Sequence, residues 1–171
     1  MVSYCPLVWV FCGRKLNTKI NNLHHRVLRA VYRDETSSFD ELLKKDGSFS
    51  IHHRNVQLLA IEMYKVIHGL SPELMDDVFR LNQANREDVA FNTRGQSDFY
   101  NSNNPKSLKY GLETLRHFGP RVWELVPNSL KETDTFSNFK KGIKQWLPIQ
   151  CPCRLCQSYI QGLGYCNITS V

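Results

Sequence analysis

The chain has 171 residues, of which 42% are apolar and 22% are charged, and its formal net charge is +6 at pH 7. This length suits one domain, or a small domain with an appended tail, and the apolar share excludes wholesale disorder. The first 33 residues carry six Lys or Arg and no acid, residues 34–134 carry twelve basic and sixteen acidic residues, and the remainder carries four basic residues and no acid. We expect the two basic ends to attract phosphate polymers or anionic surfaces, the alternative being ordinary solvated helix faces.

Residues 2–12 are apolar but reach only about half of a bilayer span, so we expect a buried helix there and no membrane partner. No positively charged leader and no small-residue cleavage site accompany them, which argues against a signal peptide. Three of the six cysteines crowd into residues 151–156, too close together for a spread disulfide framework. These features favour an intracellular protein, nuclear or cytoplasmic.

Apolar residues at three- and four-residue steps predict a first helix over residues 15–32. Its apolar stripe consists of Leu16, Ile20, Leu23, Val27, Ala30 and Val31. A short helix is expected over residues 39–45, capped by Ser37 or Ser38 and stopped near Gly47. The strongest pattern predicts a helix over residues 51–68 that ends at Gly69 in the left-handed conformation. Its buried stripe consists of Val56, Leu59, Ala60, Met63 and Ile67.

The run Ser71-Pro72-Glu73 predicts another helix start, with Ser71 as the cap and Pro72 at the first helical position. Residues 82–104 are polar and rich in Asn, Ser and Gly, which predicts a long loop, with short strands near residues 91–93 and 108–110. Helices return over residues 112–117, 120–125 and 135–147. The last of these is expected to bury Phe136, Phe139, Ile143 and Trp146.

The predicted fold class is mainly α: a small helical bundle with a loop-rich middle, compatible with a short β-hairpin, and a cysteine-rich tail. We expect four segments, namely a basic helical segment over 1–80, a polar loop region over 81–111, C-terminal helices over 112–148 and the tail over 149–171.

The basic helices are candidate nucleic-acid contacts. On the first helix Lys19, Arg26, Arg29 and Arg33 fall partly on one side, where they would follow a phosphate backbone, with Tyr32 nearby as a stacking aromatic. A smaller patch on the last helix consists of Lys140, Lys141 and Lys144. We expect RNA or DNA as the partner.

The tail carries the best metal candidate, Cys151-Pro-Cys153-x-x-Cys156. Thiolates at this spacing share one tetrahedral Zn²⁺, with Cys166 or a histidine completing the shell. The alternatives are reduced structural thiols or a degraded site, because no second Cys-x-x-Cys or His pair follows.

Two other patterns are poor metal candidates. The pairs His24-His25 and His52-His53 lie on helices, where adjacent side chains point about 100° apart, so we expect half-buried or surface histidines. The pair Asp76-Asp77 follows a helix start, so we expect solvated acids near a helix N-terminus rather than a metal-binding hairpin.

Three segments, taken together and in order, carry a family resemblance. They are SYCPLVWVFCGRKLNTKINNLHHRVLRAVYRD over 3–34, SFSIHHRNVQLLAIEMYKVIHGLSPELM over 48–75 and GPRVWELVPNSLKETDTFSNFKKGIKQWLPIQCPCRLC over 119–156. This order resembles the C-terminal end of reverse transcriptases from non-LTR retrotransposons of the jockey-like type. The resemblance implies RNA-directed DNA synthesis as the parent activity, with the catalytic palm upstream of these segments and no catalytic residue in this chain.

Under this interpretation residues 1–80 are thumb-like, the upstream polymerase domain is a partner, and the tail belongs to the cysteine- and histidine-rich zinc-binding tails of such polymerases. Two alternatives remain open at the level of sequence. One is an inert relic of a truncated element, and the other is a protein-interaction module, reused by the host, in which zinc clips the tail.

Overall fold

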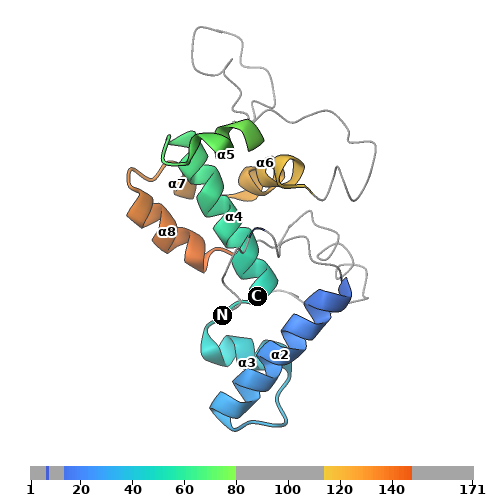
Figure 1. Cartoon of the computed structure of the whole chain (residues 1–171). Helices are drawn as coiled ribbons and strands as arrows, with labels where there is room; N and C mark the ends of the chain where they lie inside the picture. Colours follow the sequence, from blue (N-terminus) through green and yellow to red (C-terminus); the bar gives the residue numbers. More distant parts are fainter. Residues whose placement is uncertain (1–6, 8–13, 80–113, 148–171) are drawn as a thin grey trace, which may run out of the picture. The chain divides into compact units, whose positions relative to one another are not determined.

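The computed structural model describes Leu7 and residues 14–79 and 114–147, and within these residues it contains seven α-helices and no strand (Figure 1). The predicted mainly α class is confirmed for this part of the chain. The predicted opening helix, the polar loop with its strands and the cysteine-rich tail lie outside the described residues. The chain divides into two compact units, which comprise residues 14–56 and residues 57–79 with 114–147 of the described part.

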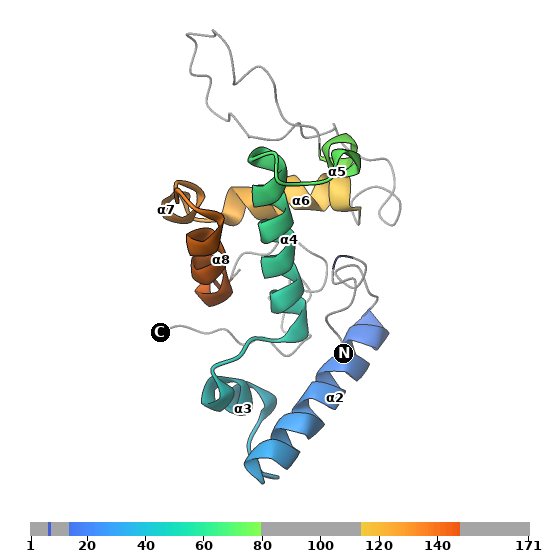
Figure 2. The ribbon, with the colours of Figure 1, turned by 60° about the vertical axis from the view of Figure 1, so that its left-hand side comes forward.

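The first unit is built from α2 (Arg14–Tyr32), α3 (Phe39–Asp46) and the first residues of α4 (Ile51–Ile67). Figure 2 shows α3 beside the C-terminal half of α2. The two helices pack through three buried leucines, and two partly buried aromatic side chains flank them. The leucines are Leu28, Leu42 and Leu43, and the aromatic residues are Tyr32 and Phe39.

The structure differs from the sequence pattern in the face of α2 that is buried. Leu28, which lies outside the predicted stripe, is only 4% exposed, whereas the large residues of the stripe are exposed, except for the half-buried Ile20. The reason is the short connection over residues 33–38, which returns α3 to the side of α2 that carries Leu28 and Tyr32. Periodicity found the apolar stripe correctly but could not show which helix face the next element would cover.

Three helices end in a left-handed residue. Gly47 after α3 and Gly69 after α4 have φ values of 64° and 66°, as their positions predict, while Arg33 after α2 has a φ of 50°. In each case the next backbone N–H closes a Schellman-type bond to a carbonyl five residues earlier. These bonds run from Asp34 to Arg29, from Ser48 to Leu43 and from Leu70 to Lys65.

The second unit packs the rest of α4 with α5 (Glu73–Val78), α6 (Leu115–Leu125), α7 (Asn128–Lys131) and α8 (Phe136–Gln145). Tyr64 of α4 stacks on Phe139 of α8 with ring centroids 4.2 Å apart, and its hydroxyl donates to the Thr133 carbonyl. Gln57 donates to the carbonyls of Lys144 and Trp146, which lie at the C-terminal end of α8. The fully buried core of this unit includes Leu59, Met63, Val66, Phe79, Val122 and Ile143.

Two predicted helix starts in this unit are wrong. The residue that caps α5 is Pro72 rather than Ser71. The helices expected over 112–117 and 120–125 are one helix, α6, which begins at Leu115 and runs through Pro120. A proline in a helix interior costs one backbone hydrogen bond, and burial of Pro120 and its neighbours against the core offsets this cost.

Fewer side chains of α8 are fully buried than the sequence predicted. Phe139 and Ile143 are fully buried, as expected, but Phe136 and Trp146 are half-buried.

We predict that Gly119→Ala destabilises the chain, because a Cβ at this buried position would overlap the Phe79 ring and lie 2.8 Å from Met63 Sδ. Overpacking of a core costs about 1–3 kcal/mol, which exceeds the roughly 1 kcal/mol that alanine gains over glycine in a helix. The measurement is the urea midpoint of unfolding. The matched control is Gly142→Ala, whose Cβ would meet only the movable end of the half-buried Leu130 side chain. It should be neutral or stabilising, and equal losses for both variants would contradict this packing.

Candidate nucleic-acid interface

The helix α2 has a distinct basic face. With 100° of rotation per residue, Lys15, Lys19, Arg26 and Arg29 fall within about 80° of arc, and they extend over about 21 Å of helix. Lys19, Arg26 and Arg29 were predicted as contacts, and the structure brings them together on one helix face. Lys15 joins them, and its position was available from the same helical rotation.

These cations are not neutralised by partners in the first unit. Lys15, Lys19 and Arg26 are exposed, and across the described residues none of the three has an ion pair. The helix itself contains no Asp or Glu. Arg29 lies at the border of the face, half-buried, and its Nε is buried without a hydrogen-bond partner among the residues described.

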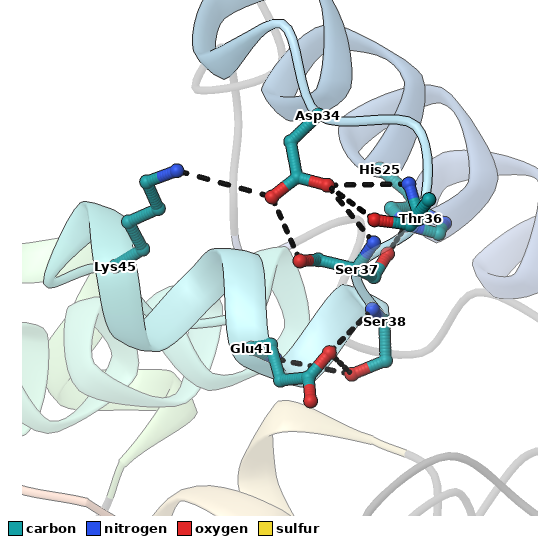
Figure 3. A network of polar contacts seen from close by, with 7 residues as sticks. All are labelled: His25, Asp34, Thr36, Ser37, Ser38, Glu41 and Lys45. Atoms are coloured by element: carbon teal, nitrogen blue, oxygen red, sulfur yellow. Dashed lines mark hydrogen bonds and ion pairs between the residues drawn. The ribbon is translucent and has the colours of Figure 1, made fainter.

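Two of the carboxylates that follow α2, those of Asp34 and Glu41, are used in local hydrogen bonds instead (Figure 3). Asp34 accepts from the Ser37 hydroxyl at 2.7 Å, from the backbone N–H groups of Ser37 and Thr36, and from the Thr36 hydroxyl. Lys45 Nζ lies 3.8 Å from Asp34 Oδ2, the oxygen that also accepts from the Ser37 hydroxyl. These bonds, led by the one from the Ser37 side chain, lower the pKa of Asp34 to about 2.

The start of α3 uses a second carboxylate in the same way. Ser38, one of the two predicted caps, forms a capping box in which its side chain accepts from the Glu41 N–H and the Glu41 carboxylate accepts from the Ser38 N–H. Hydrogen bonds from Ser38 lower the pKa of Glu41. Asp34 and Glu41 therefore stay ionised at neutral pH, and they are oriented by donors that belong to their own turns.

Tyr32 does not offer a free ring for base stacking. Its hydroxyl donates to Asp46 at 2.8 Å, its ring borders the leucine cluster, and Lys45 Nζ lies 5.1 Å from the ring centroid. Tyr32 therefore links α2 to α3. The basic face of α2 has no exposed aromatic ring from Tyr32 on which a base could stack.

The predicted patch on α8 lies in the second unit. Lys140, Lys141 and Lys144 are exposed and cover about 100° of arc beside the buried Phe139 and Ile143. Lys144 stands in the last helical turn, where a cation also complements the helix dipole. This patch is shorter than the face on α2, because its three lysines span little more than one helical turn.

The two histidine pairs differ in how deeply they are buried. His24 and His25 are half-buried beside Phe39, as expected, whereas His52 and His53 are buried rather than half-buried or exposed. Burial lowers the pKa of His24, helped by nearby Arg54, so this side of α2 gains no positive charge at neutral pH. Asp76 is in the first turn of α5 and Asp77 follows it, which confirms that the pair lies on a helix.

No group of three or more His, Cys, Asp or Glu within the described ranges is arranged to hold a metal ion. Cys151, Cys153, Cys156 and Cys166 lie outside those ranges, so the zinc site stays a prediction.

Comparison of the chain with protein-family models, with curated proteins and with solved structures gives no match. Within the described part of the chain, no helix is both long and apolar enough to cross a lipid bilayer.

We predict that Asp34→Asn lowers stability at pH 7, because the amide cannot accept all the hydrogen bonds that the carboxylate accepts. The pKa of Asp34 is lowered in the folded state, so its stabilising effect is present above the unfolded value of 3.8 and is lost as pH falls towards about 2. The difference in urea midpoint between the parent and the variant should therefore shrink below about pH 4.

The control is Glu35→Gln, which removes the neighbouring exposed carboxylate, one that makes no hydrogen bond among the described residues. Its effect should be small. A penalty for Asp34→Asn that stays constant from pH 7 to pH 3 would contradict the assigned network.

Proposed function

We propose that the chain is a nucleic-acid-binding, non-catalytic part of an RNA-directed DNA polymerase of the non-LTR retrotransposon type, as the resemblance of its three segments implies. The observation that carries the binding role is the basic face of α2, four Lys and Arg on one side of a helix without a carboxylate. A catalytic role is not assigned to any residue of the chain.

The dimensions of this face suit a phosphate backbone. Its length of about 21 Å corresponds to about six nucleotides of one strand at 3.4 Å per nucleotide. Lysine and arginine side chains are long enough to contact phosphates over this distance while the helix axis stays at the groove edge or beside a single strand. Each neutralised phosphate releases counterions, so binding should weaken steeply with salt.

The chemistry of the arginines on this face also suits a phosphate partner. A guanidinium binds phosphate oxygens through charge-assisted and often paired hydrogen bonds, and Arg26 is exposed on this face. Binding through such contacts positions the protein without reading bases. With Tyr32 engaged by Asp46 and Lys45, we expect little dependence on sequence.

The smaller lysine patch on α8 is assigned a secondary role. Three exposed lysines add attraction for any polyanion, but the patch is short and one of its members also serves the helix end. The zinc-binding tail, with Cys151, Cys153, Cys156 and Cys166 as ligands, remains part of the proposal through the family resemblance.

We predict that Lys19→Gln combined with Arg26→Gln weakens binding of the full chain to a fluorescein-labelled single-stranded RNA. The measurement is fluorescence anisotropy at several salt concentrations. Removing two phosphate contacts should lower the slope of log affinity against log salt by about 1.4.

The matched control is Lys44→Gln combined with Arg54→Gln, which removes the same charge from exposed positions of the first unit outside the α2 face. A control that lowers the slope as much as the α2 variant would show that only net charge matters. An unchanged slope for the α2 variant would mean that this face is merely solvated.

A further inference from the structure

The exposed apolar face of α2 is the largest unexplained surface feature of the described residues. Leu16, Leu23, Val27 and Val31 are 41%, 57%, 50% and 66% exposed, and they account for four of the six large apolar side chains exposed in the described part of the chain. With 100° of rotation per residue, Leu16, Leu23 and Val27 lie 100–140° from Leu28 about the helix axis, and Val31 lies 60° from it. Aliphatic side chains do not stack with bases, so nucleic-acid binding leaves this face without a role.

The spacing of this face is that of a coiled-coil seam. Residues 16, 20, 23, 27 and 30 alternate in steps of four and three, which places Leu16, Leu23 and Ala30 at d positions and Ile20 and Val27 at a positions. β-Branched residues at a with leucine at d favour a pair of helices over larger bundles. The seam covers two heptads.

The same register places a cation at each position along one edge. Lys19 and Arg26 occupy successive g positions, both exposed, and Arg33 follows one heptad later, just past the last helical residue. Two of the three positions on the opposite edge are covered by the protein itself, because Asn17 is buried and His24 packs beside Phe39, whereas the third, Val31, is exposed. A partner must therefore approach from the seam and the cationic edge.

We propose that this face binds a single partner helix that carries an apolar seam and carboxylates along the edge facing Lys19 and Arg26. The distribution of charge along α2 makes a second copy of this chain an unsuitable partner for this face. In an antiparallel pair of α2 helices the g edges would meet, cation against cation, and in a parallel pair each g cation would meet His24 or Val31 of the other copy. Neither arrangement supplies the carboxylates that the edge lacks.

The test measures binding of the full chain to a synthetic four-heptad peptide with Ile at a, Leu at d and Glu at every e and g position. The matched peptide has Lys at e and g. The chain should bind the acidic peptide and not the basic one at low ionic strength. Lys19→Glu combined with Arg26→Glu should reverse this preference.

The seam is tested by Leu23→Gln combined with Val27→Gln, which leaves the charge unchanged. Each of these side chains would bury about half of its surface in the complex, so affinity for the acidic peptide should fall about tenfold or more. Leu70→Gln combined with Leu74→Gln, which alters two exposed leucines of the second unit, should leave affinity unchanged. RNA binding should survive the Leu23 and Val27 changes, which separates this proposal from the function proposed above.

Four results of the binding and self-association measurements would overturn the proposal. They are the absence of binding to the acidic peptide, equal binding of both peptides, unchanged affinity after the Leu23 and Val27 substitutions, and self-association of the chain that those substitutions abolish. A large fall in the urea midpoint of the Leu23 and Val27 variant would also overturn it, because the face would then be covered by the chain itself.

Discussion

The packing of Leu28 against Leu42 and Leu43 fixes the rotation of α2 about its own axis. Successive side chains of a helix are 100° apart, so one buried position determines where all the others lie. With Leu28 turned inwards, Lys19 and Arg26 fall on one exposed side and the aliphatic stripe falls on another. Both proposed binding surfaces depend on this one contact. The hydrogen bond from Tyr32 to Asp46 holds the same rotation from the C-terminal end of the helix.

The connection between α2 and α3 keeps the cations unpaired. Of its two carboxylates, Asp34 is saturated by donors of its own turn, while Glu35 is exposed and forms no ion pair among the described residues; Glu41 closes the capping box of α3. A carboxylate that already accepts several hydrogen bonds gains little from an additional exposed ion pair, since such pairs contribute about 0–1 kcal/mol. The basic face of α2 thus retains its charge although acids follow directly after it in the sequence. A helix that carries unpaired cations beside an exposed apolar stripe is suited to two different ligands, a nucleic acid and an acidic helix, and both would contact Lys19 and Arg26.

Much of the fold was predictable from local signals, and the errors have a common cause. Caps at Ser38, Gly47 and Gly69 follow from the conformations that these residues favour, and they were found where expected. The continuous helix through Pro120 was missed, because tertiary burial outweighed a local helix-breaking signal. Three of the four cations of the α2 face, Lys19, Arg26 and Arg29, were identified from composition and spacing, and Lys15 was missed. The sequence did not show that these cations lack ion pairs, because this depends on the hydrogen bonds that the neighbouring acids form with α3 and the turn before it. The exposure of the apolar stripe could not be predicted for the same reason, because it depends on which face of α2 packs against α3.

The most direct test of this account is hydroxyl-radical footprinting of the full chain, read at single residues by mass spectrometry. It compares the oxidation rates of adjacent side chains on α2, Val27 and Leu28, which are 50% and 4% exposed. The account predicts rapid oxidation of Val27 and Leu23, and protection of Leu28 together with its partners on α3. Protection of Leu23 and Val27, with Leu28 oxidised, would mean that α2 is rotated differently, and the assignment of its basic and apolar faces would then be wrong.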